Sequence, residues 1–291
     1  LTVDWTADNP PLWDRPPPVC SALTIGVRGN CGSISLGAGY NIQDAFTGDL
    51  VLVGLDASAE INIQHLGDKF GLVRSLTIFN CGIRGNNDSF IIRTLGGFGT
   101  VHLQGCWWLT HPNADDGKSH ASGMNMPHGT GGVTIIDHKT NGVWFREHSI
   151  FYGKGGGPHY IMNNNAEGHG RCITQFRAHP EYVDGPYTRP ATARVLGDIW
   201  MCNNVVRWPV PHPVGRGGGA ALTMWSNPDH VTHVKGNHLT NVPDGCLAVL
   251  PQSAERNYYN ERGWVIGRVE IENNTFTNTE RDCVQISGAE D

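Results

Sequence analysis

A short pattern recurs seven times between Leu76 and Phe276, and it limits what this chain can fold into more than any other feature. Each copy reads apolar, any, apolar, any, any, polar or Cys, any, apolar, with a few polar residues at the apolar positions. The sixth position is held, copy by copy, by Cys81, Cys106, His138, Asn164, Asn204, Asn237 and Asn274. Successive copies are 25 to 40 residues apart, so the unit is fixed while the gaps vary. This pattern predicts stacked repeats with insertions in the loops between them.

The residue types within the repeat indicate strands. The two-residue alternation in each copy is the period of a β-strand, and the interruption before the sixth position indicates a turn. The copies are rich in Val, Ile, Thr and Asn, with Gly and Asn at the corners, and no long run of good helix formers occurs. The segment from Val269 to Ile286 contains a strand, a corner with Asn, a second short strand, a loop and a third strand. The chain is therefore predicted to be all-β.

These repeats resemble those of the right-handed parallel β-helix superfamily of pectate-lyase-like proteins and phage tailspikes. The resemblance covers roughly residues 72–287. It implies a single-stranded right-handed parallel β-helix solenoid in which Asn side chains at one corner stack in a ladder. An amide both donates and accepts hydrogen bonds, so identical residues in neighbouring coils can satisfy each other. Asn204, Asn237 and Asn274 are the best candidates for this ladder.

The chain divides into three parts. Residues 1–21 hold five of the 17 prolines and are predicted to form a Pro-rich N-terminal arm. Residues 22–75 hold shorter apolar runs, which predict irregular first coils or a cap, and residues 76–291 form the regular parallel β-helix. A terminal coil has unpaired edges, so the arm is expected to lie over the solenoid or over a neighbouring chain. The chain opens with Leu1 instead of Met, which we interpret as a processed or excised piece.

Composition excludes several classes of protein. The formal net charge of −6, from 21 basic and 27 acidic residues, lacks the basic footprint of a nucleic-acid-binding protein. No stretch approaches the ~20 apolar residues of a membrane-spanning helix. The eight Cys residues form no CxxC pair, which argues against a zinc ribbon or a thioredoxin-type motif. Cys246 and Cys283 each follow their ladder Asn by nine residues, so we expect them one coil apart in the interior as free thiols.

Two consecutive repeats place polar residues just past the corner, where side chains of neighbouring coils can gather. The candidate catalytic residues are Arg146, Glu147, His148, His169 and Arg171, and the candidate substrate-binding residues of the same region are Tyr152, His179 and Tyr182. A polysaccharide lyase needs such groups, because Arg neutralises the uronate carboxylate and His or Tyr removes the C5 proton. The alternative is that these side chains line turns and form surface ion pairs, which contribute little.

Other catalytic patterns are incomplete. Gly168-His169-Gly170 resembles one motif of polygalacturonase-type glycosidases, but the Asn-Thr-Asp and Arg-Ile-Lys motifs of that group are missing. No aligned pair of acidic residues offers the ~6.5–9.5 Å carboxyl separation of an inverting hydrolase. Calcium would need acidic residues stacked on successive strands, and this sequence does not supply them. His230, His233 and His238 lack a second column of ligands, so no metal or other cofactor is predicted.

Tryptophans recur through the repeats. Trp107 and Trp144 each stand where a side chain can point outward, so either could offer a stacking platform for sugar rings. Packing in the core or at a subunit interface is the competing interpretation.

These observations lead to two hypotheses about function. The first is an extracellular or virion-associated β-helix protein that binds or processes polysaccharide, lyase-like or glycosidase-like. The second is a non-catalytic structural or adhesive β-helix component of a phage tail, virion or cell surface. The sequence leaves catalysis open. It predicts a glycan partner, allows a homotrimer or another assembly, and favours an extracellular, surface or virion-associated location.

Overall fold

The structure is a computed structural model of the chain. It describes residues 2–6, 22–28, 30–31, 34–36, 49–53, 56–57, 61–64, 73–80, 82–84, 90–95, 98–109, 122–126, 132–140, 148–154, 158–167, 172–177, 197–207, 220–225, 230–242, 245–250, 267–279 and 283–286. The elements within these residues are all β-strands. The all-β prediction is confirmed for this part of the chain.

The strands form three sheets, which we name A, B and C. Sheet A consists of β1 (Thr2–Thr6), β2 (Ala22–Arg28), β5 (Asp49–Val53), β8 (Val73–Phe79), β11 (Phe98–Gln104), β14 (Val133–Ile136), β17 (His159–Met162), β20 (Ile199–Cys202), β23 (Val231–Lys235) and β26 (Arg268–Glu272). Sheet B consists of β3 (Asn30–Cys31), β6 (Asp56–Ala57), β9 (Gly82–Arg84), β12 (Trp107–Leu109), β15 (Lys139–Thr140), β18 (Asn165–Glu167), β21 (Val205–Arg207), β24 (His238–Thr240) and β27 (Thr275–Thr277). Sheet C consists of β4 (Ile34–Leu36), β7 (Ile61–Gln64), β10 (Phe90–Leu95), β13 (Ser122–Met126), β16 (His148–Lys154), β19 (Cys172–Arg177), β22 (Ala220–Trp225), β25 (Gly245–Leu250) and β28 (Val284–Ile286).

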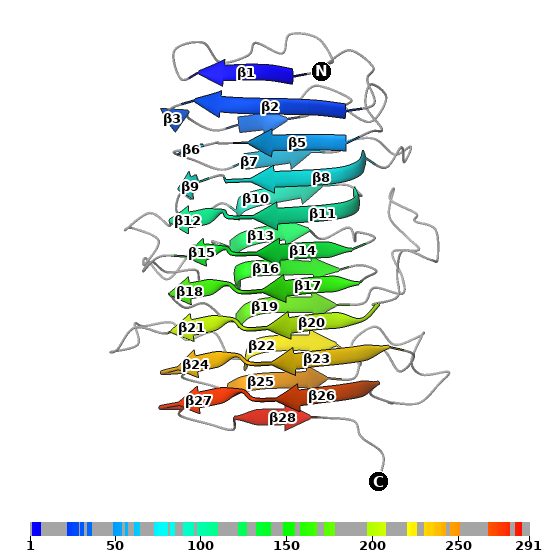
Figure 1. Ribbon diagram of the computed structural model, residues 1–291, viewed down its shortest axis with the longest axis vertical. Coiled ribbons are helices and arrows are strands. Elements are labelled where there is room, and N and C mark those ends of the chain that lie inside the picture. Colours follow the sequence, from blue (N-terminus) through cyan, green and yellow to red (C-terminus); the bar gives the residue numbers. More distant parts are fainter. Residues whose placement is uncertain are drawn as a thin grey trace.

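The order of the strands produces stacked coils. From β2 onward the described strands visit sheets A, B and C in turn, and each set of three, here called a coil, pairs with the set before it (Figure 1). The strand pairings within the described residues are all parallel. This architecture is compatible with a parallel β-helix.

The N-terminal strand extends sheet A beyond the first coil. Residues 2–6 of the predicted arm form β1, which pairs with β2 from Thr2 and Thr24 to Thr6 and Arg28 (Figure 1). The rest of the arm lies outside the described residues. Strands β2 and β5, from the segment predicted to be irregular, belong to the same sheet as the later strands.

A left-handed residue makes the turn from sheet A to sheet B. The residue before the sixth repeat position has a φ between 50° and 66° in seven coils, at Asn80, Gly105, Asp137, Asn163, Asn203, Gly236 and Asn273. Gly has no Cβ penalty there, and Asn and Asp tolerate this region better than other side chains. The corner is therefore specified locally by the sequence.

Alternating residues of sheet A form the core. Leu103, Ile135 and Ile161 occupy equivalent positions in consecutive strands and are 0–1% exposed. Each such buried aliphatic side chain contributes about 1.5–3 kcal/mol relative to an exposed one. Residues between them point outward, so sheet A has one buried face and one open face.

The Asn ladder is confirmed. Asn164 donates its side-chain amide to Oδ1 of Asn204 at 2.9 Å, and Asn204 and Asn237 donate to the following Asn in the same way, also at 2.9 Å. The series ends with Asn274 in the last described coil and begins at His138, whose backbone N–H donates to Asn164. Cys81 lies outside the described residues.

The stacked cysteines agree with the prediction in part. Cys246 and Cys283 are free thiols in neighbouring coils, as the pairing of Leu247 with Val284 places them. Cys246 is buried, and this burial, with the neighbouring Cys283, raises the pKa of its thiol to about 12. Cys283 in the last coil is exposed, so the prediction of an interior position is wrong for that residue.

Candidate functional site

The structure describes three of the site residues predicted from the sequence, which are His148, Tyr152 and Trp107. His148 is the first residue of β16 and pairs with Cys172, the first residue of β19, while Tyr152 lies further along β16 and pairs with Gln175. The backbone at the start of these two strands is therefore side by side. Seven predicted residues lie outside the described part of the chain: Arg146, Glu147, His169, Arg171, His179, Tyr182 and Trp144. Their gathering into one site stays a prediction.

Trp107, the third placed residue, lies in β12 of sheet B and is 38% exposed. It pairs with Gly82 of the coil before it and with Lys139 of the coil after it. Its indole lies where a Cβ at Gly82 would be, so the missing side chain of Gly82 makes room for this ring. Trp107 is thus an exposed aromatic side chain, as the sequence predicted, and part of one ring face is covered by the chain itself.

The open face of sheet A carries an aromatic stack that the sequence analysis did not select. Tyr160, Trp200 and His233 occupy the same outward position in β17, β20 and β23, and we call them the aromatic column. The ring centroids of Tyr160 and Trp200 are 4.7 Å apart with an angle of 15° between the planes. Those of Trp200 and His233 are 4.9 Å apart with an angle of 18°. Both distances equal the spacing of about 4.8 Å between neighbouring strands, so the sheet holds the rings in register.

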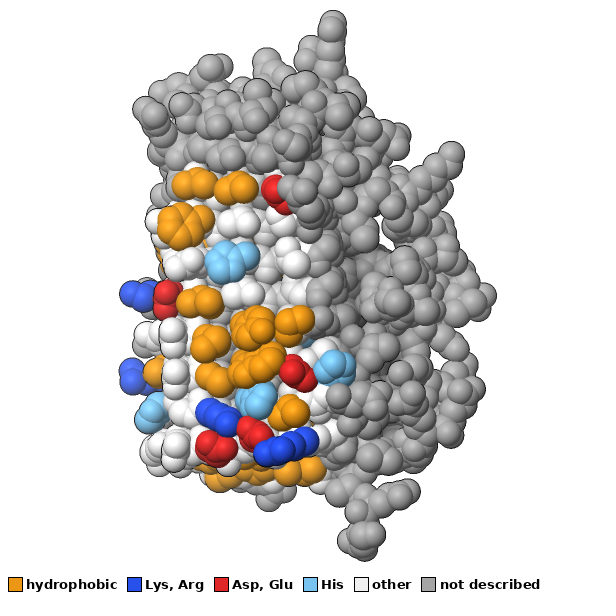
Figure 2. All heavy atoms as spheres, turned by 45° about the vertical axis from the view of Figure 1, so that its right-hand side comes forward, with side chains coloured by type: hydrophobic (Ala, Val, Ile, Leu, Met, Phe, Trp, Pro, Cys, Tyr) orange, Lys and Arg blue, Asp and Glu red, His pale blue; other side chains and the backbone are white. Residues whose placement is uncertain are grey.

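A signal for this column is present in the sequence. Each ring occupies the second position of three consecutive repeat copies, between two inward residues. Figure 2 shows hydrophobic side chains gathered on this face of the molecule, with charged groups beside them toward the C-terminal coils. In the register of sheet A, Ile136 and Met162 lie next to the aromatic column. The column therefore belongs to a larger apolar strip on this face.

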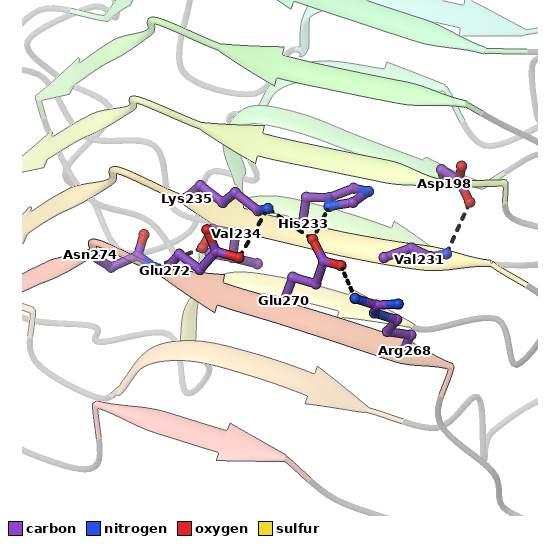
Figure 3. A network of polar contacts seen from close by, with 9 residues as sticks. All are labelled: Asp198, Val231, His233, Val234, Lys235, Arg268, Glu270, Glu272 and Asn274. Atoms are coloured by element: carbon purple, nitrogen blue, oxygen red, sulfur yellow. Dashed lines mark hydrogen bonds and ion pairs between the residues drawn. The ribbon is translucent and has the colours of Figure 1, made fainter.

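A cluster of ion pairs borders the C-terminal end of the aromatic column (Figure 3). Glu270 accepts hydrogen bonds from Lys235 Nζ and lies beside His233 Nδ1, each at 2.8 Å, and its other oxygen is 2.8 Å from Arg268 Nη2. Lys235 also pairs with Glu272 at 3.1 Å. The hydrogen bond from Lys235, followed by the contact with His233, lowers the pKa of Glu270 to about 2.

Asp198 directly precedes β20 and lies on the same face of sheet A (Figure 3). Its Oδ1 accepts a hydrogen bond from the backbone N–H of Val231 at 2.9 Å and lies 2.9 Å from His230 Nδ1. The Val231 N–H, and then His230, lower the pKa of this carboxyl below its usual value. Asp198 and Glu270 are therefore ionised at neutral pH, whereas a general acid needs a raised carboxyl pKa. These two residues fit a role in orientation and binding better than one in proton donation.

The histidines considered as metal ligands have other contacts. His230 and His233 face Asp198 and Glu270, and His238 is an exposed residue of sheet B. Within the described ranges no three His, Cys, Asp or Glu side chains come together in a group that could hold a metal ion. The described part of the chain also contains no helix long and apolar enough to cross a membrane.

Comparisons with known proteins returned no relative: no protein-family model matches the sequence, and neither does any curated protein or solved structure.

Proposed function

We propose that this chain is a right-handed parallel β-helix protein that binds polysaccharide on the open face of sheet A. The aromatic column of Tyr160, Trp200 and His233 is the observation that carries the proposal. In this proposal the protein acts extracellularly, on a cell surface or on a virion. A homotrimer or another assembly stays a prediction.

The open face has the chemistry that a glycan needs. Sites for small polar ligands combine apolar and aromatic surface with a few fixed hydrogen-bonding groups. Here the apolar surface comes from the aromatic column with Ile136 and Met162, and the polar groups from the residues around Glu270. Tyr and Trp also carry a polar tip on an apolar ring, which suits a ligand with both hydroxyl groups and C–H surface.

The rigidity of this face favours binding by a preformed surface. Each ring of the aromatic column stands on a strand that is paired on both sides, and its neighbours fix the ring plane. A surface that is already ordered loses little conformational freedom when a ligand binds. The ionised, paired carboxylates of Asp198 and Glu270 support binding without turnover at this face.

Polysaccharide processing is the second candidate, and the pairing of His148 with Cys172 favours it. Glu147 and Arg171 directly precede these two residues in the sequence, so the predicted catalytic residues come from neighbouring coils. This reaction would use sheet C and is separate from binding on sheet A. If it occurs, His148→Ala lowers the rate by about 10²-fold or more, while His238→Ala on sheet B leaves it unchanged.

A polysaccharide panel tests both candidates. The protein is incubated with immobilised neutral and acidic polysaccharides, and retention is measured together with unsaturated ends and new reducing ends in solution. We expect retention on part of the panel. Retention without new ends supports a binding protein, and new ends that depend on His148 support processing. If no polysaccharide is retained and no new ends appear, the proposal is refuted. The structural β-helix of the second hypothesis then remains.

A further inference from the structure

Tyr160 stands at the N-terminal end of the aromatic column, and among the described residues one face of its ring carries no stacked ring. Trp200 stacks on one side of this ring, and on its other side the register of sheet A places Thr134. Thr134 in turn pairs with His102. Of the rings in the column, Trp200 has both faces covered, and His233 lies between Trp200 and Glu270.

The short side chain of Thr134 leaves a recess between two taller neighbours. His102 and Tyr160 belong to β11 and β17, which are two strand spacings apart, or about 9.6 Å. The stacked rings of the aromatic column are 4.7 Å apart. One further ring layer therefore fits between His102 and Tyr160, above Thr134. Ile136 bounds the floor on one side.

The described residues that line the recess are neutral. The outward positions of β11, β14 and β17 with their adjoining residues are Thr100, His102, Gln104, Thr134, Ile136, Pro158, Tyr160 and Met162. None of these is Asp, Glu, Lys or Arg. The described charged residues nearest to them are Asp137 at the corner after β14, Asp49 in β5 toward the N-terminal coils, and Asp198 toward the C-terminal coils. Figure 2 shows the densest group of charged side chains below the hydrophobic strip, toward the C-terminal coils.

Hydrogen-bonding groups surround the open ring face. The hydroxyl of Thr134 lies on the floor, and Nε2 of His102 is 3.3 Å from Oε1 of Gln104 in the wall opposite Tyr160. A ring with apolar C–H groups on its face and hydroxyls at its edge matches this arrangement. An acidic sugar would gain no Lys or Arg partner from the described residues around the recess, and the net charge of −6 further disfavours it.

We propose that the recess between His102 and Tyr160 binds one neutral pyranose ring, stacked on the free face of Tyr160 with Thr134 beneath its edge. The inference rests on the proposed function and narrows the ligand to neutral polysaccharide. The ionic cluster around Glu270 then contacts the glycan only further along the chain, toward the C-terminal coils.

Filling the recess tests this inference. In Thr134→Tyr the new ring takes the place of the sugar and stacks on Tyr160, as Tyr160 does on Trp200. Thr77→Tyr is the matched control, since Thr77 pairs with His102 from the other side and lies outside the recess. Affinities for cellohexaose, maltohexaose, mannohexaose and hexagalacturonate are measured by calorimetry, and thermal unfolding verifies that each variant is folded.

We expect the wild type to bind at least one neutral hexasaccharide and not hexagalacturonate. Thr134→Tyr weakens that binding at least 10-fold, and Thr77→Tyr and the conservative Thr134→Ser change it less than twofold. If Thr134→Tyr does not fold, Tyr160→Ala takes its place, with the same expected loss.

Two results would overturn the recess and keep the proposed function. In the first, Thr134→Tyr leaves the binding of a neutral hexasaccharide intact while Trp200→Ala weakens it. In the second, the wild type binds hexagalacturonate and none of the neutral hexasaccharides. Binding of none of the four overturns the recess, and the polysaccharide panel then decides the proposed function separately.

Discussion

Oδ1 of Asn237 accepts two hydrogen bonds from Asn204, one from the side-chain amide at 2.9 Å and one from the backbone N–H at 3.0 Å. The amide of Asn237 donates in turn to the carbonyl of Met201 at 2.8 Å. Both Asn side chains are buried, at 1% exposure or less. A single side chain thus satisfies two backbone groups of the preceding coil, and this couples each coil to the next.

Asn237→Ala should lower the free energy of unfolding by about 1–3 kcal/mol, because the buried amide and N–H of Asn204 lose their acceptor. Asn165→Ala is the control, since Asn165 is exposed on sheet B and its side chain lies outside the ladder. That variant should stay within about 0.5 kcal/mol of the wild type. Urea unfolding measures both. Equal effects of the two substitutions would show that the ladder contributes no particular stability.

His138 makes stability depend on pH near neutrality. Its ring is fully buried in the ladder column beside Cys106, and burial lowers its pKa below 6.5. The unfolded chain therefore binds a proton more readily than the folded one, and stability falls as the pH drops below about 6.5. His138→Asn removes this group and supplies the ladder amide. We expect its free energy of unfolding to fall less between pH 7.5 and 5.5 than that of the wild type; parallel curves would contradict this role for His138.

The repeat itself could be predicted from the sequence because its determinants are local. Asn203 takes the left-handed corner and Asn204 the ladder position in one short segment, and the same happens in other copies. Predicting the aromatic column requires the strand register, because Tyr160 and Trp200 are 40 residues apart and meet only when β17 pairs with β20. The proposed catalytic residues lie mostly between the copies, where no repeat pattern constrains the chain.

Glu270 makes the stability of the fold depend on pH in the strongly acidic range. Its pKa falls from 4.5 to about 2 on folding, so its contribution is complete above about pH 4.5 and is lost as the pH falls toward 2. Glu270→Gln should lower the unfolding temperature at pH 7 and flatten its decline in this window. Glu272→Gln is the control, since Glu272 is 55% exposed and has the longer contact of 3.1 Å with Lys235. The opposite ranking in thermal unfolding would assign the acid sensitivity to other groups.

Trp200 lies at the centre of the aromatic column, so the affinity of Trp200→Ala for the polysaccharide retained from the panel tests glycan binding on sheet A most directly. Phe79→Ala is the control, because Phe79 is an exposed aromatic residue of the same sheet, outside the column. We expect calorimetry to give at least ~10-fold weaker binding for Trp200→Ala, equivalent to about 1.4 kcal/mol, and binding within about twofold of the wild type for Phe79→Ala. A folded Trp200→Ala protein with wild-type affinity would contradict a binding site on this face.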